Sequence, residues 1–222
     1  MKKIMFALCF FFTVLTSIAV CTASIAHASP LEQIMSFNEV PKLGYSGLKN
    51  TYFNLNGDAL QLNVNGVNRN SNHISGGYVR LMSKNGQKDY LSFPVKNCPF
   101  FSAYKFNING GNEFLLLREG VSAVSDRACE GLWIIGKYKG NYISFISLDT
   151  LRNAGLIFAD IAAETANGEL RLIGITRDRN CRDGYYRGHR VRSYDLAYCA
   201  VNEARLFWDN NAQWFGIKLI NY

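Results

Sequence analysis

Residues 132–148 have the sequence LWIIGKYKGNYISFISL and decide the fold class. Two runs rich in apolar and aromatic side chains, residues 132–138 and 142–148, flank the turn-forming triplet Lys139-Gly140-Asn141. Apolar runs of strand length on either side of a glycine-containing turn are typical of a β-hairpin. This stretch therefore predicts two antiparallel strands joined by a tight turn.

The same pattern recurs along most of the chain. Asn56-Gly57, Asn85-Gly86 and Asn167-Gly168 are hairpin dipeptides, and Asp209-Asn210-Asn211 is another turn-forming triplet. The short apolar or alternating runs around these turns are expected to be strands, at residues 52–62, 77–82, 90–95, 114–117, 156–163, 170–176, 194–200, 204–208 and 214–220. The sequence thus predicts a mostly β fold built from antiparallel β-meanders.

Two short helical segments are expected beside the strands. Ser29-Pro30-Leu31-Glu32 fits a capping box with Pro at the first helical position, which predicts a short N-terminal helix within residues 29–41. A further helical turn is expected at residues 148–153. There Ser147 can cap the first turn, and Asp149 would lie at the positive end of the helix dipole.

A faint internal repeat divides the strand-rich part into two related units. Alignment of Cys98 with Cys199 also superposes four further pairs, Ala103 with Ala204, Phe106 with Phe207, Asn109 with Asn210 and Phe114 with Phe215. We therefore expect two antiparallel units, residues 42–128 and 129–222. These units either pack into one sandwich or stand side by side.

The first 28 residues have the features of an export signal. Lys2 and Lys3 precede an apolar run over residues 4–20, and Ala26-His27-Ala28 is a small-x-small cleavage site. The mature chain is expected to begin near Ser29 and to be periplasmic, on the cell surface or secreted, without a transmembrane span. The alternatives are an uncleaved membrane anchor and lipidation of Cys21.

Export determines how the cysteines are interpreted. Cys9 and Cys21 would leave with the signal, so that four cysteines remain, an even number typical of disulfides in an exported protein. Four cysteines allow three connectivities, of which we favour the nearest-neighbour pairs Cys98–Cys129 and Cys181–Cys199. A zinc site is disfavoured because the chain has no C-x-x-C spacing, and no metal or other cofactor is expected.

Positive charge is concentrated in residues 177–192, RDRNCRDGYYRGHRVR, which we call the arginine segment. It contains six arginines and only two aspartates, so it carries a formal charge of +4 within a chain of net charge +7. Arginine forks match phosphate, sulfate and carboxylate groups, and neighbouring aromatic rings can stack on sugars. The candidate ligand-binding residues are Arg182, Tyr185, Tyr186, Arg187, His189, Arg190 and Arg192. A solvated loop partly neutralised by its aspartates is the simpler alternative.

The arginine segment indicates an acidic partner, whether an acidic glycan, a phosphate-bearing lipid or a host protein. Nucleic acid is not an expected partner of an exported protein. A second candidate surface for carbohydrate comprises Trp133, Trp208, Trp214, Tyr194, Tyr198 and Phe207, although aromatic side chains on strands more often pack in the core. Trp214 is the member for which exposure is the informative test.

No catalytic motif is present in the sequence. Asp149, Asp160, Glu164, Asp195, His73 and His189 are available for acid–base chemistry, but none belongs to a G-x-S-x-G, H-E-x-x-H or papain-like cysteine pattern. We therefore name no catalytic residue. The alternative to a binding protein is a secreted hydrolase acting on cell-wall or glycan material.

The second half of the chain resembles a known family. Leu132-Trp133-Ile134-Ile135, Asn167-Gly168, the cysteine strand 194–199 and Arg205-Leu206-Phe207 follow the order found in the surface-adhesin E-like family of exported bacterial proteins. About 80 residues are covered, and a clean Tyr-Ile-Asp at 142–144 is lacking. The resemblance implies an adhesin-like surface or periplasmic binding protein.

Overall fold

The fold is mostly β, as predicted, and the described residues contain one short helix. The computed structural model describes residues 30–38, 49–67, 74–95, 100–108, 111–123, 126–178, 185–186, 189–190, 192–193 and 196–222. Within these residues, neighbouring strands pair antiparallel throughout. The meanders expected from the sequence are therefore present. The export signal lies outside the described residues.

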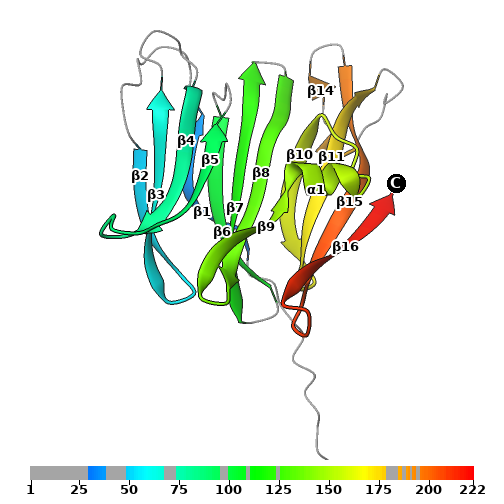
Figure 1. Ribbon diagram of the computed structural model, residues 1–222. Helices are drawn as coiled ribbons and strands as arrows, with labels where there is room; N and C mark the ends of the chain where they lie inside the picture. The colour runs from blue at the N-terminus through cyan, green and yellow to red at the C-terminus, as the bar shows by residue number, and fades with distance from the viewer. Residues whose placement is uncertain are drawn as a thin grey trace, which may run out of the picture.

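Three large sheets are stacked face to face as three layers (Figure 1). The N-terminal sheet has the order β2-β3-β4-β5, with bounds Lys49–Leu55, Asp58–Val67, Ile74–Ser83 and Asp89–Val95. The middle sheet has the order β1-β6-β7-β8-β9, with bounds Glu32–Asn38, Phe100–Ile108, Asn112–Ala123, Asp126–Tyr138 and Asn141–Ser147.

The C-terminal sheet has the order β10-β11-β15-β14, and β16 also pairs with β15. The bounds are Asp160–Ala166, Glu169–Asp178, Leu196–Asp209, Arg192–Ser193 and Trp214–Asn221 for β10, β11, β15, β14 and β16. Strands β12 (Tyr185–Tyr186) and β13 (His189–Arg190) form a separate two-stranded pair. The only helix among the described residues, α1 (Leu148–Asn153), follows β9.

The middle sheet is buried on both faces, which explains its continuous apolar runs. In β7, Phe114 and Leu116 pack toward the C-terminal sheet, whereas Leu115 and Leu117 pack toward the N-terminal sheet. Successive side chains of a strand point to opposite faces, so a strand segment covered on both sides has apolar residues at consecutive positions, as residues 114–117 do. The result is a three-layer β arrangement with two hydrophobic cores.

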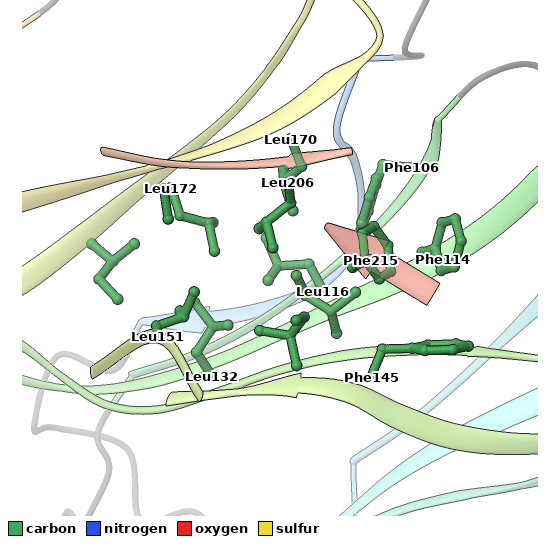
Figure 2. Packing of buried hydrophobic residues seen from close by; sticks show 14 of the residues in the cluster. Phe106, Phe114, Leu116, Leu132, Phe145, Leu151, Leu170, Leu172, Leu206 and Phe215 are labelled. Carbon is green, nitrogen blue, oxygen red and sulfur yellow. The ribbon is translucent and has the colours of Figure 1, made fainter. Parts of the chain in front are cut away.

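The first core lies between the middle and C-terminal sheets (Figure 2). Leu116 and Leu132 of the middle sheet face Leu170 and Leu206 of the C-terminal sheet, and Leu151 of α1 closes one end. The other end is aromatic and contains Phe106, Phe114, Phe145, Trp208 and Phe215. Buried side chains of this size contribute about 1.5–3 kcal/mol each to folding.

The second core lies between the middle and N-terminal sheets. Leu60, Leu62 and Leu81 of the N-terminal sheet face Phe101 and Leu115 of the middle sheet, all fully buried. Met35 of β1 and Tyr142 of β9 also belong to this core. The middle sheet is therefore common to both cores.

Three of the hairpin turns expected from the sequence are confirmed by their backbone geometry. Asn56-Gly57 has φ values of 49° and 80°, Asn167-Gly168 has 52° and 78°, and Lys139-Gly140 has 48° and 81°. Positive φ at both central residues is the signature of a type I′ turn, which matches the twist of antiparallel strands. Each of these pairs joins two neighbouring strands directly.

The helix expected within residues 29–41 is wrong, because residues 32–38 form strand β1. Strand β1 pairs with β6, and this pairing places Met35 in the second core. A capping box is a local signal, and here an antiparallel partner with an apolar pocket overrides it. The helical turn expected at 148–153 is confirmed as α1, with a Ser147 side chain that accepts from the Thr150 N–H.

The division into sheets differs from the expected division into two units. The expected boundary between residues 128 and 129 falls inside β8, which pairs with β7 and β9 in one sheet. In the alignment of the internal repeat, hairpin β6–β7 corresponds to hairpin β15–β16. However, β5 and β6 belong to different sheets, whereas β11 and β15 are neighbours in the same sheet.

Candidate functional site

The arginine segment begins and ends at one end of the C-terminal sheet. Strand β11 ends at Asp178, which is opposite Ala197 of β15, and Arg192 of β14 is also opposite Ala197. The register of β12 and β13 places Tyr185 opposite Arg190 and Tyr186 opposite His189. The backbone thus brings four of the seven candidate ligand-binding residues into one hairpin.

The remaining members of this candidate site are described less completely. Arg182 and Arg187 lie outside the described residues, and Arg192 is in β14. The segment nevertheless has a defined support, because it begins in β11 and ends in β14, and both strands pair with β15 in a sheet with one buried face. Loops held on rigid elements in this way commonly carry binding residues.

The predicted disulfides fall on positions whose side chains are not described. Cys98 and Cys181 lie outside the described residues. Cys129 is opposite Gly120 in the middle sheet, and Cys199 is opposite Thr176 in the C-terminal sheet. The two pairings stay predictions.

The aromatic residues singled out from the sequence have separate positions. Trp208 is buried in the first core, Trp133 packs against the second core, and Phe207 and Trp214 are 40% and 42% exposed. Phe207 lies over Gly216, where an added Cβ would come within 2.2 Å of its ring. Tyr194 lies outside the described residues, and Tyr198 is in β15. These residues therefore do not form one exposed surface.

The described candidates for acid–base chemistry are engaged in ion pairs. Asp149 pairs with Arg152 at 3.2 Å, Asp160 pairs with Arg118 of β7, and Glu164 pairs with Arg171 at 2.7 Å. The Asp160–Arg118 pair joins the C-terminal sheet to the middle sheet. Asp195 and His73 lie outside the described residues, and His189 is in β13.

A charged network on the outer face of the C-terminal sheet was not anticipated from the sequence. Arg171 of β11 and Arg205 of β15 are directly opposite each other, an arrangement that is unfavourable for like charges. Glu203 accepts from Arg171 and, at 2.5 Å, from the Arg205 Nε. The same carboxylate accepts a 2.6 Å hydrogen bond from the hydroxyl of Tyr222. Glu203 therefore holds two arginines and the last residue of the chain together.

The environment of Glu203 favours its ionised form. Its side chain has 0% exposure, and burial raises the pKa of a carboxyl group. The hydrogen bonds from Tyr222, Arg171 and Arg205 outweigh that effect, so the pKa of Glu203 is lower than its ordinary value. The spacing Glu203-x-Arg205, which places both side chains on one face of a strand, is the sequence signal that could have identified this network.

A second polar junction fastens the N-terminal sheet to the middle sheet. The hydroxyl of Tyr142 donates to the Leu55 carbonyl at 2.7 Å and lies 3.0 Å from the Asp58 carboxylate. The ammonium group of Lys137 is 2.9 Å from the same carboxylate. The hydrogen bond from Lys137 lowers the pKa of Asp58. Burial and the nearby Asp58 carboxylate raise the pKa of Tyr142. The junction connects the β2–β3 turn to β8 and β9.

Within the part of the chain that the structure describes, no group of three or more His, Cys, Asp or Glu side chains is placed to hold a metal ion. No helix among the described residues has the length and hydropathy needed to cross a membrane. No protein-family model, curated protein or solved structure matches this chain.

Proposed function

We propose that this protein is an exported, adhesin-like binding protein that holds an acidic ligand through the arginine segment. The observation that carries the proposal is that a +4 segment begins at the end of β11 and ends in β14, two strands that both pair with β15. Clustered guanidinium groups beside aromatic residues suit phosphate, sulfate and carboxylate groups. The ligand is an acidic glycan, a phosphate-bearing lipid or an acidic surface of a host protein.

Three arginines in and beside the C-terminal sheet support this assignment of roles. Arg171 and Arg205 on the outer face are bound to Glu164 and Glu203, and Arg118 is bound to Asp160. These arginines hold the scaffold together. The arginine segment is then the concentrated source of positive charge that is available for a partner.

The test is retention on immobilised heparin as a function of salt. Replacement of Arg182, Arg187, Arg190 and Arg192 by Ser should abolish retention at about 0.15 M salt, where the screening length is about 8 Å. Thermal stability should change little, because exposed ion pairs contribute about 0–1 kcal/mol. Vesicles with and without phosphatidic acid then distinguish a lipid headgroup from a sulfated glycan.

A charge-matched variant controls for net charge. Replacement of the exposed residues Lys84, Lys88, Lys139 and Lys218 by Ser removes the same four charges from other surfaces and should leave most heparin retention intact. Equal loss in both variants would show that binding follows net charge alone. Unchanged retention in the arginine variant would refute the proposed function.

A further inference from the structure

The outer face of the N-terminal sheet carries a diagonal of aromatic and hydrogen-bonding side chains, of which only Arg80 is charged. Register pairs Tyr52 of β2 with Gln61 of β3, and Asn63 of β3 with Arg80 of β4. Tyr78 precedes Arg80 by two residues and therefore lies on the same face of β4. Alternation directs these five residues away from the second core, which receives Leu60, Leu62, Val79 and Leu81.

Both tyrosines of this diagonal are open to solvent. Tyr52 is 57% exposed and Tyr78 is 49% exposed, the largest values for aromatic side chains within a strand of the described chain. Neither ring contacts another aromatic ring or a cation among the described residues. Exposed aromatic rings without a packing role are typical of binding surfaces.

The amides on this face are also unusual for strands. Asn is depleted in strands because its side chain competes for the backbone, yet Asn50, Asn54 and Asn63 occupy outward positions of β2 and β3. Asn63 donates to Asn50 at 2.8 Å, so that each amide still has a group that can bond to a ligand. The outer face of the C-terminal sheet is different, because its charged groups neutralise one another.

We propose that this diagonal is a second binding site, which takes a neutral β-linked polysaccharide. Amide groups both donate and accept, as sugar hydroxyls do, and no carboxylate of the described residues lies along the diagonal. The C–H face of an equatorially substituted pyranose is apolar and packs on an exposed tyrosine ring. Arg80 supplies a further donor without requiring an anion.

The size of the site selects a chain of sugars over a single sugar. Strand spacing and rise per residue place the Cα atoms of Tyr52 and Tyr78 about 17 Å apart, with Asn63 and the largely buried Gln61, 9% exposed, between them. A monosaccharide can contact only one end of such a diagonal. An extended oligosaccharide can stack on both rings and hydrogen-bond to Asn63 and Arg80 between them.

The experiment is isothermal titration of the purified protein with cellohexaose and with chitohexaose, two neutral β-1,4-linked probes. The double variant Tyr52→Ala/Tyr78→Ala should weaken binding by about tenfold or more, because it removes both stacking rings. The double variant Tyr52→Phe/Tyr78→Phe should retain most of the affinity. Asn54→Ala, on the same face but beyond the diagonal, is the matched control and should bind as the parent does.

Two variants tested on both kinds of ligand distinguish this site from the arginine segment. The four-arginine variant should bind the neutral probes normally while losing heparin, and the tyrosine variant should do the reverse. Failure of the parent to bind either neutral probe would overturn the inference, as would full affinity in the double alanine variant. So would a parent dimer that the double alanine variant converts to a monomer, because this face would then be an interface between copies.

Discussion

Phe114 of β7 and Phe215 of β16 lie against each other across the first core, with ring centroids 4.7 Å apart and an interplanar angle of 59° (Figure 2). The internal repeat superposes these same two positions. The contact connects the middle sheet to the edge strand β16 of the C-terminal sheet. It therefore helps to hold two layers together.

Truncation of either ring should destabilise the protein strongly. Phe114→Ala or Phe215→Ala is expected to lower the free energy of unfolding by about 3–5 kcal/mol, measured by urea denaturation. Phe207→Ala, at a half-exposed position of the neighbouring strand, is the control and should cost less. A double-mutant cycle with leucine at both core positions should give a coupling of about 0.5–1.5 kcal/mol. Zero coupling would contradict a direct contact.

Removal of the Tyr142 hydroxyl tests the junction between the N-terminal and middle sheets. Tyr142→Phe should lower the free energy of unfolding by about 1–3 kcal/mol, because the buried Leu55 carbonyl loses its 2.7 Å donor. Tyr90→Phe is the control, since the neighbouring ring has no hydrogen bond from its hydroxyl to a described residue. Equal stability of the two variants would show that the junction contributes nothing.

The Glu203 network predicts a specific dependence on acid. Its pKa is lowered in the folded protein, so the stabilisation is fully present above the ordinary glutamate pKa of 4.5 and disappears as pH falls through the lower folded value. Glu203→Gln should lower the free energy of unfolding at pH 7 by about 1–3 kcal/mol. The difference between parent and variant should shrink below about pH 4. A constant difference down to pH 2 would show that the effect is not ionic.

The Ser147 cap of α1 gives a smaller and more local prediction. Ser147→Ala removes the acceptor for the Thr150 N–H and should cost about 0.5–2 kcal/mol in thermal or urea unfolding. Ser92→Ala, at an exposed position of β5 without a side-chain hydrogen bond to the described residues, should be neutral. A loss of stability as large in the control would point to a general effect of serine removal.

The cysteine prediction concerns covalent structure. We expect peptide mapping without reduction to recover Cys98 linked to Cys129 and Cys181 linked to Cys199 in protein taken from its native compartment. Each closed loop typically contributes about 2–4 kcal/mol. Recovery of four alkylatable thiols would contradict both the pairing and an oxidising compartment.

Much of the strand pattern could be predicted because turn chemistry is local. Asn56-Gly57 and Asn167-Gly168 specify type I′ turns on their own, and Ser147 caps α1 on its own. The expected strand over residues 52–62 is in fact two strands, β2 and β3, separated by the Asn56-Gly57 turn. Strand β6 was missed, although its apolar residues enter both cores.

Features that depend on tertiary partners could not be predicted in the same way. Residues 196–200 and 204–208, from two separately expected runs, belong to one strand, β15, because the polar pair between them is satisfied in the fold. Asn202 accepts from the Ile157 N–H and donates to the Gly155 carbonyl, and Glu203 holds the charged network. An apolar pattern also says nothing about which sheet will cover a given face, so the third layer was not anticipated.

Because both faces of the middle sheet are buried, the chain cannot easily be cut into shorter fragments that fold alone. Removal of either outer layer would uncover a wide apolar sheet face that includes Leu115 and Leu117 on one side or Leu116 and Leu132 on the other. Uncovered strands of this kind self-associate readily. Neither half of the chain is therefore expected to be usable as a free-standing module. A nascent or partly unfolded copy becomes resistant to aggregation only when residues from nearly the whole length of the strand-rich chain have assembled.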